Sequence, residues 1–184
     1  MSTTMTPEQR VSTVFQTLER AKNVDVTIGL TTLLDSALVV ANVAKHMSAD
    51  EETILAALLQ DIGLFCPPPE NWSDNPSQSA SDIGADYLRK FGFPKKTCEL
   101  IKSEILVKRY IVTTDFVYFK VFKDSPLAGK WIAPLSPEEM SELEKDPLFH
   151  QKVQIRKWKA GIWNPELPPP LDTYRDMAIR NIQI

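Results

Sequence analysis

Residues 30–63 read LTTLLDSALVVANVAKHMSADEETILAALLQDIG. Their first half places apolar residues at the 3.6-residue spacing of a core-facing helix, at Leu30, Leu33, Leu34, Ala37, Leu38, Ala41 and Ala44. Their second half repeats the pattern at Ile54, Leu55, Leu58 and Leu59. Between them, the segment from Ser48 to Glu51 has the spacing of a capping box, which starts a new helix. The stretch therefore predicts two long helices that meet at a tight corner.

The rest of the chain has the same helical character. Thr6, Pro7 and Gln9 have the spacing of a second capping box and predict a helix over 7–22. Residues 114–123 are rich in β-branched and aromatic side chains, but their place among helices favours a helix. Further helices are expected at 78–91, from 94 past Ile105, from 136, over 147–160 and over 171–180. We expect an all-α bundle of about 7–9 helices.

Length and composition are those of one globular domain. The chain has 184 residues, of which 43% are hydrophobic and 24% are charged. We therefore expect a single domain over residues 1–184.

The net charge of −3 comes without a dense basic stripe, which argues against a nucleic-acid partner. Because the sequence has no leader pattern and no apolar window approaching about 18 residues, we expect no membrane partner and a cytoplasmic location. Cys66 and Cys98 support neither a disulfide framework nor a zinc site.

One octamer connects these helices to chemistry. The segment AALLQDIG at 56–63 resembles the AALLHDIGH signature of the HD-domain superfamily, with Gln60 at the histidine and Asp61 at the aspartate. Upstream, LDSAL at 34–38 resembles the family's LEHAL segment, with Ser36 where the first metal histidine stands. The resemblance implies an HD-domain-like helical fold over most of the chain.

Later segments resemble one branch of that superfamily, the mixed-valent diiron organophosphonate oxygenases related to inositol oxygenase. GADYL at 84–88 matches the helix after the third metal histidine, whose position falls on Ala80. EILVKRY at 104–110 resembles the branch's HVxAKRY segment. Glu104 then stands at a metal histidine, and Lys108 at a substrate-contacting lysine.

The last matching segment is RKWK at 156–159, which resembles RRWD. It places Arg156 at the family's phosphonate-side arginine and Lys159 at the last metal aspartate. By the resemblance, the family has six metal-ligand positions, and this chain keeps the family's residue only at Asp61. At the other five positions it has Ser36, Gln60, Ala80, Glu104 and Lys159. A metal cation needs at least three suitable protein ligands, and Lys159 places an ammonium where the metal needs an anionic ligand. We expect no metal and no cofactor, and at least one ion pair across the former metal site.

Two functions remain open. In the first, the emptied site is a pocket for a small, mostly apolar natural-product intermediate, and the protein is a metal-independent lyase, isomerase or cyclase, including a pericyclase that promotes intramolecular cycloaddition. In the second, it is a non-catalytic pseudoenzyme that binds a small ligand or a protein. For catalysis we predict Asp61, Glu104, Lys108, Lys159 and Tyr110. For substrate binding we predict Leu34, Ser36, Gln60, Phe65, Ala80, Tyr118, Trp131 and Arg156. The sequence leaves a homodimer open.

Overall fold

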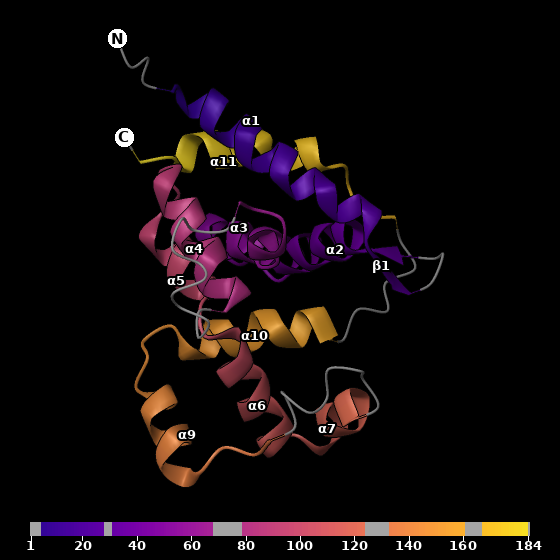
Figure 1. Ribbon diagram of the computed structural model, residues 1–184, viewed down its shortest axis with the longest axis vertical. Coiled ribbons are helices and arrows are strands. Elements are labelled where there is room, and N and C mark those ends of the chain that lie inside the picture. The colour runs from indigo at the N-terminus through magenta and orange to yellow at the C-terminus, as the bar shows by residue number, and fades with distance from the viewer. Residues whose placement is uncertain (1–4, 28–30, 68–78, 124–132, 161–166, 184) are drawn as a thin grey trace. The chain divides into compact units, whose positions relative to one another are not determined.

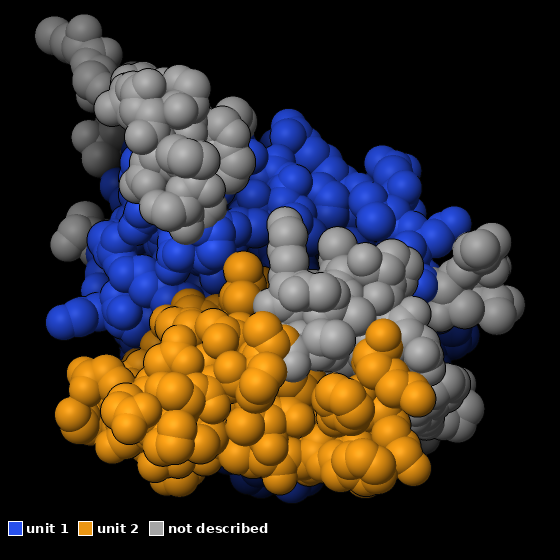
Figure 2. All heavy atoms as spheres, turned by 60° about the horizontal axis from the view of Figure 1, so that its bottom comes forward, with its two compact units in different colours: residues 1–102, 162–184 blue, residues 103–161 orange. Residues whose placement is uncertain are grey.

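The computed structural model describes residues 5–27, 31–67, 79–123, 133–160 and 167–183. The chain divides into two compact units, coloured separately in Figure 2. Unit 1 comprises residues 1–102 and 162–184, and unit 2 comprises residues 103–161. One domain over residues 1–184 stays a prediction, and each unit is described by itself below.

The described part of unit 1 is helical apart from one small two-stranded β-sheet (Figure 1). Its α-helices are α1 (Pro7–Leu18), α2 (Leu33–His46), α3 (Glu51–Leu59), α4 (Ala80–Lys90), α5 (Lys95–Ile101) and α11 (Arg175–Asn181). Its 3-10 helices are η1 (Glu19–Asn23), η2 (Ile62–Leu64) and η4 (Leu171–Tyr174). Strands β1 (Asp25–Thr27) and β2 (Thr31–Thr32) pair antiparallel and were not expected from the sequence. The predicted all-α class is confirmed.

The predicted helix corner is formed by α2 and α3, which lie side by side (Figure 1). A capping box in which Thr32 and Asp35 bond reciprocally starts α2. The cap of α3 differs from the prediction: it is Asp50, whose carboxylate accepts the backbone N–H of Thr53. Ser48 cannot serve because it takes a left-handed turn with φ 56°. Most of the predicted apolar residues of both helices are buried, namely Ala37, Leu38, Ala41, Ala44, Ile54, Leu55, Leu58 and Leu59. Leu33 and Leu34 at the start of α2 are half-buried, and Leu30 lies outside the described residues.

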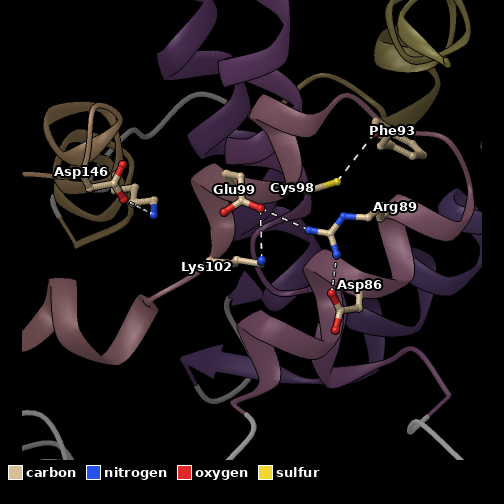
Figure 3. Close-up of polar contacts among 8 residues, drawn as sticks. Asp86, Arg89, Phe93, Cys98, Glu99, Lys102 and Asp146 are labelled. Atoms are coloured by element: carbon tan, nitrogen blue, oxygen red, sulfur yellow. Dashed lines mark hydrogen bonds and ion pairs between the residues drawn. The ribbon is translucent and has the colours of Figure 1, made fainter. Parts of the chain in front are cut away.

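Helices α4 and α5 pack on each other, and an ion pair between Arg89 and Glu99 bridges them (Figure 3). Arg89 contacts Asp86 at 2.6 Å and Glu99 at 3.2 Å, and Lys102 contacts Glu99 at 3.1 Å. These side chains are partly exposed, so each pair stabilises the unit by less than about 1 kcal/mol. Cys98 lies fully buried beside them with its thiol toward the carbonyl of Phe93.

Unit 2 contains α6 (Glu104–Thr114), α7 (Phe116–Lys123), α9 (Pro137–Glu144) and α10 (Phe149–Ala160). The helix predicted from residue 94 past Ile105 is interrupted at Ser103, whose φ of 61° is left-handed and separates α5 from α6. The break adds one α-helix, so the described residues form ten, which agrees with the expected bundle of about 7–9 helices. The helix expected over 114–123 is confirmed as α7. No helix in the described ranges is long and apolar enough to cross a bilayer.

Candidate functional site

The predicted site residues are divided between the two units. Unit 1 carries Leu34, Ser36, Gln60, Asp61, Phe65 and Ala80, and unit 2 carries Glu104, Lys108, Tyr110, Tyr118, Arg156 and Lys159. Trp131 lies outside the described residues. The two halves of the site are therefore described one at a time.

In unit 1, the corner between α2 and α3 determines where Ser36 and Gln60 lie. Each stands about twelve residues from Ser48, which is about 18 Å along a helix axis. Ser36 belongs to α2 and Gln60 directly follows α3, and these two helices pack on each other. Ser36 is 9% exposed and Gln60 is 1% exposed. The amide of Gln60 donates to the carbonyl of Ala57 at 2.9 Å, so part of its hydrogen-bonding capacity is used inside α3.

Asp61 and Ala80 are brought to one region by a close backbone contact between η2 and α4. A Cβ added to Gly63 would lie 1.7 Å from the Ala80 carbonyl oxygen, and one added to Gly84 would lie 2.9 Å from the Gly63 nitrogen. Only glycine permits so close an approach. Asp61, which is 7% exposed, precedes this contact by two residues.

The two apolar residues predicted to bind substrate in unit 1 are more exposed to solvent than Gln60 and Asp61. Leu34 and Phe65 are both half-buried. The carbonyl of Phe65 accepts a hydrogen bond from the Arg20 guanidinium at 3.0 Å, which ties the residue after η2 to η1. In unit 1 the predicted positions therefore supply a buried carboxylate, a buried amide and a small hydroxyl.

In unit 2, four predicted residues form what we call the ion cluster: Glu104, Lys108, Arg156 and Lys159. Glu104 Oε1 lies 2.5 Å from Lys108 Nζ and 3.8 Å from Arg156 Nη1. The three side chains are 17%, 11% and 3% exposed, respectively. Lys159 acts on the Glu104 carboxylate electrostatically. One buried carboxylate thus faces three cationic side chains.

Local helix geometry accounts for much of this arrangement. Glu104 begins α6, where the helix dipole favours a negative charge, and Lys108 follows one turn later at the i,i+4 spacing. On α10, Arg156 and Lys159 are three residues apart and share a face with the buried Ile155. Packing of α10 on α6 brings that face to Glu104.

The ion cluster changes the acidity of its members. Burial raises the pKa of Glu104, but Arg156, Lys108 and Lys159 together outweigh burial and hold that pKa at about 2. Burial lowers the pKa of Lys108, and the pull of Glu104 only partly offsets it. A carboxylate with a pKa near 2 is a weak base at neutral pH, whereas a lysine with a lowered pKa is a better acid than a free one. The cluster therefore suits Lys108 as a proton donor and Glu104 as its electrostatic partner.

Two predicted tyrosines have hydrogen-bond partners outside the ion cluster. Tyr110 lies two residues beyond Lys108, about 200° around α6, and its hydroxyl donates to Glu144 Oε1 at 2.8 Å. The hydroxyl of Tyr118 donates to the backbone carbonyl of Lys157 at 3.3 Å. The contact between Tyr110 and Glu144 could not be read from sequence because it depends on how α9 packs.

Two basic residues of unit 2 have contacts that sequence reasoning missed. Arg109 donates to the carbonyls of Ala133 at 2.9 Å and Pro134 at 3.1 Å, so it anchors that segment. Lys152 is 4% exposed and pairs with Asp146 at 2.5 Å. The sequence contains one sign that Lys152 lies near the predicted site residues. It stands seven residues before Lys159, which places both lysines on one face of α10.

The donor set of the ion cluster does not fit the diiron centre that the resemblance implies. The carboxylate of Glu104 is already bonded to an ammonium and faced by a guanidinium. Lysine and arginine side chains are cationic and supply no lone pair to a metal at neutral pH. Among the residues with a described position, no three His, Cys, Asp or Glu side chains gather into a group that could hold a metal.

Comparison with known proteins gives three relatives at low identity. The [1-hydroxy-2-(trimethylamino)ethyl]phosphonate dioxygenase (glycine-betaine-forming) of Leisingera caerulea is 29% identical over 129 residues, which is 68% of this chain and 65% of that protein. The alignment thus spans less than two thirds of this relative. The hydroxymethylphosphonate dioxygenase of Gimesia maris is 28% identical over 168 residues, or 88% and 82% of the two chains. Uncharacterized protein L432 of Acanthamoeba polyphaga mimivirus is 27% identical over 179 residues, or 93% and 81%. No family model matches the chain.

Proposed function

Since this chain is a distant homologue of the HD-domain diiron phosphonate dioxygenases, we propose that it is an enzyme that has kept their fold and works without their metal. The proposed activity is that of a lyase, isomerase or cyclase, including a pericyclase. Its proposed substrate is a small, mostly apolar natural-product intermediate with one polar group. Two of the three relatives are named as dioxygenases, so the reaction proposed here departs from theirs.

The observation that carries the proposal is the ion cluster. By the resemblance, Glu104 and Lys159 hold positions at which the relatives bind metal. In this chain the Glu104 carboxylate lies 2.5 Å from the ammonium of Lys108 and 3.8 Å from the guanidinium of Arg156. Buried charges that attract one another in this way need no metal ion to balance them.

The chemistry follows from the properties of the cationic side chains. Arg156 is permanently charged and offers a rigid fork of donors for a carbonyl or carboxylate. Lys108 has a lowered pKa, so it is suited to protonate a substrate oxygen while Glu104 holds the amine in place. Donors aimed at a conjugated carbonyl stabilise negative charge that develops there, and a substrate held in its reactive conformation needs no further catalyst to cyclise or isomerise.

A second function is favoured by the same short contact. A Glu-to-Lys pair at i,i+4 on one helix also stabilises helices that have no catalytic role. The alternative is therefore a pseudoenzyme that binds a small ligand or a protein partner, in which the ion cluster only supports the packing of α6 on α10.

Metabolite profiling of a deletion strain separates the two functions. We expect one compound to accumulate and to be consumed when the wild-type gene or a Lys90→Met control is restored, but not when Lys108→Met is restored. Lys90 is an exposed lysine of α4 and serves as the matched control. Purified protein dialysed against a chelator should then convert the accumulated compound. A strict requirement for added iron would refute metal independence, and equal complementation by Lys108→Met would favour the pseudoenzyme.

A further inference from the structure

Unit 2 has a groove of about 380 Å³ on its surface, which we call the acidic groove. Its apolar floor is formed by three leucines and its rim by three carboxylates. The lining residues are Leu106, Leu135, Leu143, Glu139, Glu142 and Asp146. Leu106 is 42% exposed although its helix, α6, packs on α7, α9 and α10.

Helix α9 contributes one continuous stripe to the acidic groove. Glu139, Glu142 and Leu143 follow the i, i+3, i+4 spacing, and no residue of α9 is buried. Glu142 pairs with Lys145 at 2.6 Å, but their side chains are 76% and 68% exposed. Such exposed pairs contribute little, so a cation from another molecule can replace them at small cost.

Helix α7 carries a surface of opposite character, which we call the α7 stripe. Phe116 and Val117 are 66% and 68% exposed, and Lys120 and Lys123 are also exposed. Phe116, Lys120 and Lys123 follow the i, i+4, i+7 spacing and so lie on one side of the helix. Lys120 Nζ lies 4.7 Å from the centre of the Phe116 ring. The stripe thus presents an aromatic ring and two ammonium groups together.

These two surfaces complement each other, but within unit 2 the helices α9 and α7 that carry them lie on opposite sides of α6 (Figure 1). One chain therefore cannot place its own α7 stripe in its own acidic groove. We propose that a second copy of this chain does so, with lysines against the carboxylate rim and Phe116 against the leucine floor. A groove of this size supports weak association that depends on protein concentration and ionic strength.

Sedimentation velocity over a range of protein concentrations tests the proposal. We expect the wild-type chain to self-associate at low salt and to dissociate at high salt. Lys120→Glu and Glu142→Lys should each weaken self-association by about tenfold or more, because each places like charges opposite one another. Lys22→Glu reverses an exposed lysine of η1 in unit 1 and should leave association unchanged.

Mixing the two weakened variants gives the sharpest result. The Lys120→Glu chain keeps a native acidic groove and the Glu142→Lys chain keeps a native α7 stripe, so an equimolar mixture should form dimers that neither forms alone. Circular dichroism verifies that each variant is folded. A wild-type chain that stays monomeric at every concentration would overturn the proposal and leave the groove to a different partner. Failure of the mixture to associate would also overturn it.

Discussion

Replacing Glu104 with glutamine removes the negative charge of the ion cluster and leaves three cations without their shared carboxylate. The pKa of Glu104 is about 2 in the folded protein, against an ordinary value of 4.5. At about 1.4 kcal/mol for each pKa unit, this difference corresponds to roughly 3 kcal/mol of stability at neutral pH. We therefore expect Glu104→Gln to lower the free energy of unfolding by about 3 kcal/mol at pH 7, measured by urea titration with circular dichroism.

The stability difference between the wild type and Glu104→Gln should depend on pH. Above pH 4.5 the carboxylate is ionised in both states, and the folded protein has the full stabilisation. As the pH falls from 4.5 towards 2, the unfolded chain takes up the proton first, so the wild-type protein loses that stabilisation while the variant has none to lose. The difference between the two proteins should therefore shrink steadily on acidification.

Two further variants sharpen the result. Glu142→Gln changes a carboxylate whose side chain is 76% exposed and should stay within about 0.5 kcal/mol of the wild type. Adding Lys108→Met to Glu104→Gln should recover part of the loss, because it removes a buried ammonium whose 2.5 Å contact with a carboxylate is gone. A Glu104→Gln protein as stable as the wild type, or a deficit that is equal at pH 7 and pH 3, would refute the electrostatic account.

Two other substitutions test the packing of unit 1. Gly63→Ala should lower stability by about 3 kcal/mol or more, because its Cβ would lie 1.7 Å from the Ala80 carbonyl oxygen, and an unchanged melting temperature would contradict the backbone contact between η2 and α4. Tyr174→Phe should raise stability by about 1 kcal/mol, since the Tyr174 hydroxyl is buried without a hydrogen-bond partner among the described residues and burial raises its pKa to about 12. A lower melting temperature for this variant would show that the hydroxyl is bonded.

Short stretches of the sequence are enough to predict most helices of this protein. Capping residues such as Thr6 and Ser136 bond to backbone groups three residues away, and apolar residues at helical spacing mark the buried face of each helix. For that reason, the corner between α2 and α3 could be predicted locally, whereas the helix over 116–123 was predicted only from its place among other helices. The resemblance to HD-domain proteins also rests on short segments, and the distant homology found by comparison confirms it.

Tertiary structure decided which side chains meet. The 2.5 Å contact between Glu104 and Lys108 follows from helix spacing, but the approach of Arg156 requires α10 to pack on α6. The packing of α9 on α6 brings Glu144 to the hydroxyl of Tyr110. The break at Ser103 depends on a left-handed backbone conformation that a serine seldom adopts, so no local signal marked it. Helix spacing acts over a few residues and can be read from the chain, whereas contacts between helices depend on the packing of side chains distant in sequence.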